Sequence, residues 1–141
     1  MSIHTGYQTE HNHVHFLRKR LTFSDAAATY SLGWVPANAS VIRGGVAVLT
    51  VFNAGTNNRL DLGYRNGGNS ETDDTDEFGT DLALGTAGVI VADEMATAAV
   101  NTFPKGAEIV CVLDVTGTAA TTGDCYVWVE YIVDNDGDTS S

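Results

Sequence analysis

The chain has 141 residues, of which 43% are hydrophobic, and a formal net charge of −11 at pH 7. This length predicts one domain with an ordinary hydrophobic core. No run of about eighteen apolar residues is present, which argues against a membrane-spanning helix. Residues 1–12 are mostly polar and lack the apolar stretch of a signal peptide, so we expect synthesis in the cytoplasm.

The charge is unevenly distributed along the chain. Residues 1–45 hold four basic residues against two acidic ones, whereas residues 46–141 hold three basic and sixteen acidic residues. An acidic body of this kind repels nucleic acids and anionic membranes. We therefore expect no nucleic-acid or membrane partner, and a separate role for the basic N-terminal part.

Short apolar segments with the alternation of β-strands follow one another through the first half of the chain. Strands are predicted at residues 13–23, 40–52 and 59–65, with 26–34 as a strand or a connection. The pair Gly44 and Gly45 predicts a bulge or a sharp bend. The Asn- and Gly-containing segment 53–58 has the composition of a hairpin turn.

In the second half, residues 66–80 are almost all Gly, Asn, Ser, Thr, Asp and Glu, which predicts a long surface loop. Strands are then expected at 89–91, 107–115 and 125–133, a helical turn at 93–99 and a small-residue loop at 116–124. The last strand carries valines on one face and Tyr126 and Trp128 on the other. Either face could point into the core.

Many short strands with almost no helical period predict an all-β protein, an antiparallel β-sandwich or a barrel. We expect a flexible N-terminal arm (1–12), a single β-sandwich domain (13–134) and a polar C-terminal tail (135–141). Trp34, Trp128 and the tyrosines are assigned to the core.

Three histidines at alternate positions, His11, His13 and His15, share one face of an extended strand. A zinc site would need a fourth ligand from elsewhere, and no second cluster of His and Cys follows. The pattern therefore favours a polar face of an edge strand, with a pH-sensitive contact as a smaller possibility. We expect no metal and no other cofactor.

The basic cluster Arg18–Lys19–Arg20 is too short for a nucleic-acid patch and lacks interleaved aromatic residues. Arg18 and Arg20 share a face with Phe16, and arginine suits ion pairs with carboxylates. These residues indicate a surface that binds an acidic partner, against the alternative of a simple solvated face.

Calcium and catalysis have weaker support in the sequence. The acidic residues Glu71, Asp73, Asp74, Asp76 and Glu77 favour a solvated loop over a calcium site. The run DNDGD at 134–138 resembles the start of an EF-hand loop but lacks its final glutamate and its helices. Two cysteines, Cys111 and Cys125, fit buried free thiols better than a disulfide or a catalytic nucleophile. No motif of a known catalytic site is present, so the chain is not expected to be an enzyme.

Two segments, LGWVPANASVIRGGVAVLTVF (32–52) and VTGTAATTGDCYVWVEYIV (115–133), resemble head proteins of tailed bacteriophages. They are similar to the decoration or cement proteins with a jelly-roll fold, of the type found on short-tailed Bordetella phages. This resemblance covers roughly residues 30–133, and the acidic segment 66–80 has no counterpart in it.

The resemblance implies a jelly-roll-like sandwich that forms a homodimer on the outer capsid surface of the virion, after synthesis in the host cytoplasm. It implies binding across the seams between major capsid proteins, which stabilises the head against internal DNA pressure. The N-terminal strand is then a capsid-binding strand rather than a metal site. Its expected contact residues are His13, Val14, His15, Phe16, Leu17, Arg18 and Arg20, with Leu21 as a further apolar anchor.

Two other functions are compatible with the same fold. One is a carbohydrate-binding jelly-roll module of a phage adsorption structure, which would need exposed aromatic residues and perhaps calcium. The other is a small jelly-roll metalloenzyme that uses the histidines.

Overall fold

The computed structural model describes residues 13–66, 73–98 and 100–133. The strands in these residues are β1 (His15–Thr22), β2 (Thr29–Val35), β3 (Ala39–Thr50), β4 (Asn57–Arg65), β5 (Asp74–Ala83), β6 (Gly88–Val91), β7 (Thr102–Phe103), β8 (Ala107–Thr116) and β9 (Asp124–Val133). A short 3₁₀ helix, Asp93–Thr97, lies between β6 and β7. None of the helices described is long and apolar enough to cross a membrane.

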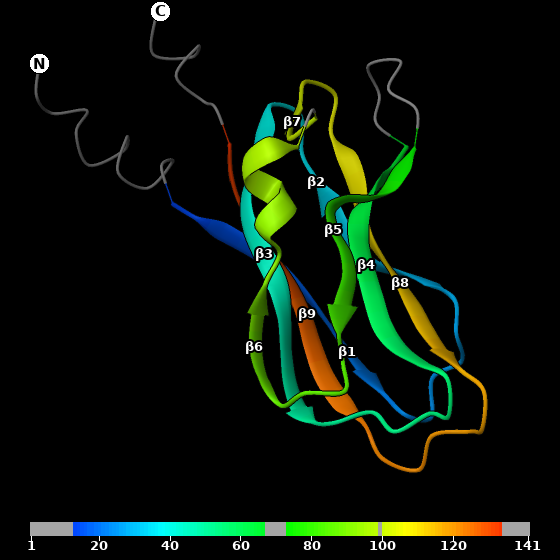
Figure 1. Ribbon diagram of the computed structural model, residues 1–141. Helices are drawn as coiled ribbons and strands as arrows, with labels where there is room; N and C mark the ends of the chain where they lie inside the picture. The colour runs from blue at the N-terminus through cyan, green and yellow to red at the C-terminus, as the bar shows by residue number, and fades with distance from the viewer. Residues whose placement is uncertain (1–12, 67–72, 99, 134–141) are drawn as a thin grey trace, which may run out of the picture.

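The strands form two antiparallel sheets that pack face to face (Figure 1). Sheet A has the order β1-β9-β3-β6, with β7 paired to β3, and sheet B has the order β2-β8-β4-β5. The pairs β1–β9, β2–β8, β3–β6 and β4–β5 are nested, as if one long hairpin had been rolled up. This is the strand order of a jelly roll, so the prediction of an all-β jelly-roll-like sandwich is confirmed.

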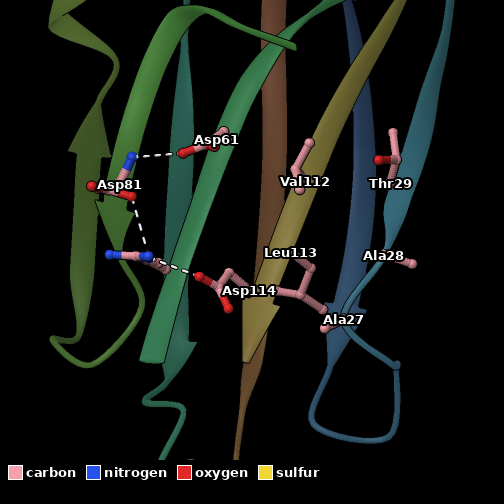
Figure 2. A pocket seen from close by; sticks show the side chains of 9 residues that line it. Ala27, Ala28, Thr29, Asp61, Asp81, Val112, Leu113 and Asp114 are labelled. Carbon is pink, nitrogen blue, oxygen red and sulfur yellow. Dashed lines mark hydrogen bonds and ion pairs between the residues drawn. The ribbon is translucent and has the colours of Figure 1, made fainter. Parts of the chain in front are cut away.

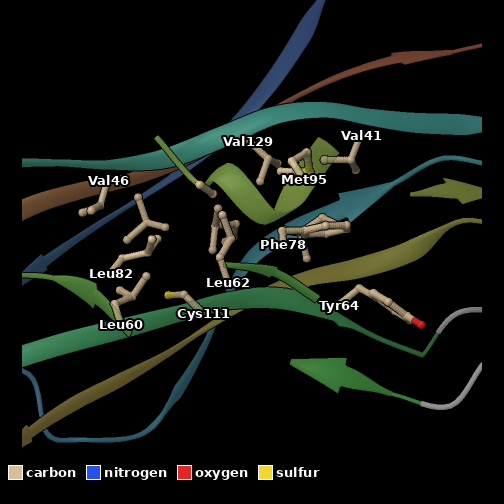
Figure 3. Packing of buried hydrophobic residues seen from close by; sticks show 14 of the residues in the cluster. Val41, Val46, Leu60, Leu62, Tyr64, Phe78, Leu82, Met95, Cys111 and Val129 are labelled. Atoms are coloured by element: carbon tan, nitrogen blue, oxygen red, sulfur yellow. The ribbon is translucent and has the colours of Figure 1, made fainter. Parts of the chain in front are cut away.

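The core lies between the sheets, and it follows the alternation of the strands. Leu60, Leu62 and Tyr64 of β4 point into it, as predicted. Tyr64 meets Phe103 with ring centroids 5.0 Å apart. Its ring centroid also lies 6.1 Å from that of Phe78, and Figure 3 shows both of these side chains in the core. In β9 the valine face is the buried one, which settles the orientation that the sequence left open.

Residues 74–80 of the acidic segment belong to a strand, so the prediction of a loop over 66–80 is wrong for this half; residues 67–72 lie outside the described residues. Strand β5 begins at Asp74 and pairs with β4 along the edge of sheet B. Phe78 is fully buried and anchors it in the core. Register shifts separate the paired positions Leu60–Leu82, Leu62–Gly79 and Tyr64–Asp74. These bulges disturb the two-residue period by which a strand is recognised in sequence.

Two local predictions in the β3 region are also wrong. The register shifts of β3 lie around Ile42 and Leu49, not at the glycine pair. Gly44 and Gly45 are paired with Val129 and Trp128 of β9, and a Cβ atom on Gly45 would lie 2.9 Å from the Trp128 ring. The glycines therefore allow a close approach across the sheet. The segment 53–56 leads from sheet A to sheet B and is no hairpin turn, because β3 and β4 do not pair.

The aromatic residues are less buried than expected. Of the tyrosines that the structure describes, Tyr64 is the buried one. Trp34 has 58% of its surface exposed, and Trp128 is half-buried on the outer face of sheet A. Assigning both tryptophans to the core is thus wrong. Trp34 is paired with Glu108 at the outer side of sheet B, where alternation directs it away from the core.

Both cysteines are free and buried, one in each sheet, which confirms the expectation of buried thiols. Burial raises the pKa of the Cys111 thiol to about 12, and burial likewise raises that of Cys125 to about 12. Because the thiolate is the reactive form, neither cysteine is suited to nucleophilic chemistry near neutral pH.

We predict that both thiols are inert to Ellman's reagent in the folded protein at pH 8. In denaturant without reductant, two thiols per chain should react, because unfolding removes the burial that raises their pKa. Absorbance after mixing measures both states. No reacting thiol in denaturant would show a disulfide, and a rapid reaction of the native protein would show exposed thiols.

Candidate partner-binding surface

Strand β1 carries most of the residues that the sequence singled out, and it is an edge strand of sheet A. It pairs with β9 without interruption, from His15 opposite Tyr131 to Thr22 opposite Asp124. Alternation divides its side chains between two directions. Leu17 and Leu21 point inward, and Leu21 is fully buried in the core. The expectation that Leu21 is an apolar anchor for a partner is therefore wrong.

The outward side chains of β1 are Phe16, Arg18 and Arg20, all of them exposed. Phe16 has 63% of its surface accessible, which is unusual for an aromatic ring on a sheet face. Leu17, on the opposite side of the strand, packs against the protein's own core. The predicted contact residues are thus separated into an outward group and an inward group.

Within the described residues, His13 and His15 do not form a cluster with other metal ligands. His13 and Val14 precede β1 and are exposed, and His15 stacks on Tyr131 with ring centroids 5.3 Å apart. In the described part of the chain, no group of three or more His, Cys, Asp or Glu side chains is placed to hold a metal ion. His11 lies outside the described residues. The two described histidines of the pattern thus lie at the exposed start of β1.

The arginines of β1 have different partners. Arg20 donates two hydrogen bonds of 2.9 Å to the carboxylate of Asp124, and these bonds lower the pKa of Asp124. The guanidinium of Arg18 lies 4.9 Å from the centre of the Tyr126 ring. Among the described residues, no carboxylate forms an ion pair with Arg18. Arg18 is therefore a stacked cation with its donors available to a partner.

The outward side chains of β1 are part of a larger surface, which we name the sheet A face. It consists of Phe16, Arg18, Arg20, Arg43, Ala47, Val89, Val91, Tyr126, Trp128, Glu130 and Ile132. Sequence reasoning found its β1 part and missed the rest. The outward aromatic residues of β9 were a usable signal, since both faces of that strand are apolar.

The outer face of sheet B is different, because its charges are paired with one another. Glu108 accepts a 2.7 Å hydrogen bond from Arg65, which together with a bond from Ser31 lowers the pKa of Glu108. Arg59 donates to Asp114 at 2.8 Å and lies 3.2 Å from Asp81.

A shallow depression of about 300 Å³ opens on this face of sheet B (Figure 2). Arg59, Asp81 and Asp114 line it and are joined by the ion pairs just described. The backbone N–H of Asp81 donates to Asp61 at 2.8 Å. No aromatic side chain of the described residues lines the depression, so it lacks the ring that would stack on a sugar.

The acidic residues of β5 show no calcium geometry. The backbone N–H of Asp76 donates to Asp74 at 3.3 Å, and the neighbouring carboxyl of Asp74 raises the pKa of Asp76. Two neighbouring carboxylates, whose charges repel each other, do not by themselves make a calcium site. Glu71 and the DNDGD run lie outside the described residues.

Solved structures from three bacteriophage capsids contain chains with this fold. A chain in the acid-stable capsid structure of Helicobacter pylori bacteriophage KHP30 is 16% identical, with a TM-score of 0.61, over 87% of this chain and 90% of that one. A chain in the cyanophage Pam1 capsid asymmetric unit is 12% identical, with a TM-score of 0.60, over 86% of each chain. A chain in the capsid of Ralstonia phage GP4 is 20% identical, with a TM-score of 0.61, over 86% of this chain and 84% of that one.

At these identities the comparisons show a shared fold. The aligned portions cover almost the whole of both chains in each pair, so the matched chains are of similar length to this one. No protein-family model matches the sequence, and no curated protein matches it.

We predict that Glu108→Gln lowers the free energy of unfolding by about 1–3 kcal/mol at pH 7, because a buried carboxylate loses its charge-assisted hydrogen bonds. The folded-state pKa of Glu108 is depressed. Its stabilisation is therefore fully present above the unfolded-state pKa of about 4.3 and is lost as the pH falls through the lower folded-state value. Urea denaturation at pH 7 and at lower pH measures the difference.

The matched control is Asp93→Asn, which removes one exposed carboxylate at the start of the 3₁₀ helix. It should change the free energy of unfolding little at any pH. An equal effect of both substitutions, or a Glu108→Gln effect that persists well below pH 4, would contradict the stabilising role of the Arg65–Glu108 pair.

Proposed function

We propose that this chain is a capsid decoration, or cement, protein of a bacteriophage. It binds the outer surface of the head across seams between major capsid proteins and stabilises the shell against the pressure of packaged DNA. The observation that carries the proposal is the whole-chain likeness to chains in three phage capsid structures. The role is structural and involves no catalysis.

The size of the matched chains supports an accessory role. Each alignment spans 84–90% of the matched chain, so the common unit is one small sandwich and not a domain of a much larger protein. A symmetric shell repeats the same binding site many times, so modest affinity at each site is sufficient for dense coverage. The acidic body of the protein is also compatible with attachment outside the shell, away from the DNA.

Strand β1 is suited to a contact with a neighbouring molecule. It is an eight-residue edge strand paired without a register shift, whereas β2 and β5 contain shifts and β6 has four residues. A long regular edge offers unpaired backbone groups to an added strand. We propose His13, Val14, His15, Phe16, Leu17, Arg18 and Arg20 as the contact strand, and a homodimer as the unit that binds the shell.

The carbohydrate-binding alternative has less support. Trp34 is exposed, but the depression on sheet B lacks an aromatic lining among the described residues, and its charged groups bind one another. Saturable glycan binding by the purified protein, abolished by Trp34→Ala, would favour this alternative over the capsid role.

We predict that the purified protein co-sediments with phage heads that lack it, and saturates at on the order of hundreds of copies per head, as a symmetric lattice requires. Quantifying the pelleted protein measures both. Removing residues 1–14 should weaken attachment at least about tenfold, because it takes away the start of the contact strand and leaves β1 intact. A longer deletion would remove β1 from its pairing with β9 and is a poorer test.

The control is removal of residues 135–141, the other end of the chain, which should leave attachment unchanged. Absence of any saturable binding by the full chain would contradict the proposed function. About a dozen copies per head would indicate a vertex or tail component instead. Unchanged binding after removal of 1–14 would show that these residues are not part of the contact, and would leave the rest of the contact strand as the binding segment.

A further inference from the structure

The sheet A face has an apolar centre on β9, β3 and β6, with Arg18 and Arg20 of β1 along one side of it. In register, Trp128 lies between Arg18 and Gly45, and the row continues to Val91. In the next row, Tyr126 lies between Arg20 and Ala47, and the row continues to Val89. Val89 and Val91 have 66% and 52% of their surfaces exposed. A continuous apolar patch on a sheet is a feature of docking surfaces, unlike scattered single residues.

Two ion pairs flank this apolar centre. On one side, Arg43 forms a forked pair with Glu130, with its shortest contact at 2.7 Å. On the other side, Arg20 forms its forked pair with Asp124. Both pairs neutralise their own charges and hold their side chains in place.

Of the three arginines of the sheet A face, Arg18 is the one without an ion pair among the described residues, and it borders the apolar centre. It is exposed, its guanidinium stacks on Tyr126, and no carboxylate of the described residues pairs with it. The face carries three arginines against one acidic residue, Glu130, whereas the other described residues include four basic and twelve acidic ones. An acidic group on a partner is therefore attracted here and repelled elsewhere on the body.

We propose that the sheet A face docks flat on the phage shell, against a shell-protein surface that presents an apolar patch with a carboxylate opposite Arg18. This inference rests on the proposed function and assigns the face that makes the contact. Trp128, Val91 and Phe16 supply the apolar contact area, and Arg18 fixes the orientation. The outer face of sheet B, whose charges are satisfied internally, points away from the shell.

Docking through the whole sheet A face gives β6 a part in the contact, whereas binding through β1 alone does not involve β6. Val89 and Val91 lie on the edge of sheet A opposite to β1, separated from it by β9 and β3. A contact limited to the β1 edge would leave them in solvent. A contact across the whole face buries them. Substitutions in β6 thus separate the two modes of binding.

The test compares Val91→Glu and Arg18→Glu with controls of the same chemistry on other surfaces. Ala83→Glu introduces the same carboxylate at an exposed position of β5, an edge strand of sheet B. Lys105→Glu reverses an exposed charge in the turn between β7 and β8. Binding to heads lacking the protein is measured by co-sedimentation over a concentration series. Thermal unfolding and the protection of the two buried thiols confirm that each variant is folded.

We expect Val91→Glu and Arg18→Glu each to weaken binding at least about tenfold, and the two control variants to bind within about twofold of the wild type. Arg18→Gln should bind with a weaker salt dependence than the wild type, because it removes the long-range attraction and little of the contact area.

Each other outcome is decisive. If the wild type binds and the sheet A variants bind equally well, the docking face is wrong and the proposed function stands. If Ala83→Glu alone loses binding, the outer face of sheet B is the docking face. If the wild type does not bind, the proposed function and this inference both fail. If Val91→Glu converts a wild-type dimer to a monomer in sedimentation velocity without weakening binding, the face joins two copies of the chain instead.

Discussion

The pairing of β9 with β1 on one side and β3 on the other is the constraint on which the rest of the structure depends. It brings the first and last strands of the described residues together in one sheet and closes the roll of nested strand pairs. Because β9 is central, the direction of its side chains decides both faces of sheet A. Val127 and Val129 fill the core, and Tyr126 and Trp128 are consequently displayed on the outside.

The two outer faces of the sandwich differ in how their charges are satisfied. On sheet B, Arg59 and Arg65 form ion pairs with carboxylates of the same face, so little of their charge is available to a partner. On sheet A, the ion pairs lie at the sides of an apolar centre, and no carboxylate of the described residues forms an ion pair with Arg18. This asymmetry suits a protein that attaches by one surface and leaves the other in solvent.

Strands rich in apolar and β-branched residues could be predicted from the sequence, including β3 with its two register shifts, whereas the mostly polar strand β5 could not. Alternation in β4 and the apolar runs of β8 and β9 identified those strands, because β4 and β8 pair with each other, and β9 with β1, without a register shift. Strand β5 was missed because its bulges break the period, and because one buried residue, Phe78, anchors a segment that is otherwise polar. The orientation of β9 was undecided because both of its faces are apolar.

The proposed binding surface was predictable only where its residues are contiguous in sequence. The outward residues of β1 are contiguous in sequence, and their exposure and charge mark them. Val89, Val91 and Trp128 join them through pairings between strands that are far apart in sequence, which composition alone does not reveal. The prediction of a bulge at Gly45 failed for the same reason, since this glycine leaves room for the backbone of β6 and for the Trp128 ring of β9, which are both distant in sequence.

A cryo-electron microscopy reconstruction of heads saturated with the purified protein tests the central claim most directly. The account predicts sandwich-shaped density on the outside of the shell, over the seams between shell subunits, with β1, β9, β3 and β6 against the shell and β4 and β5 toward solvent. Density with sheet B against the shell, or heads without added density, would contradict it.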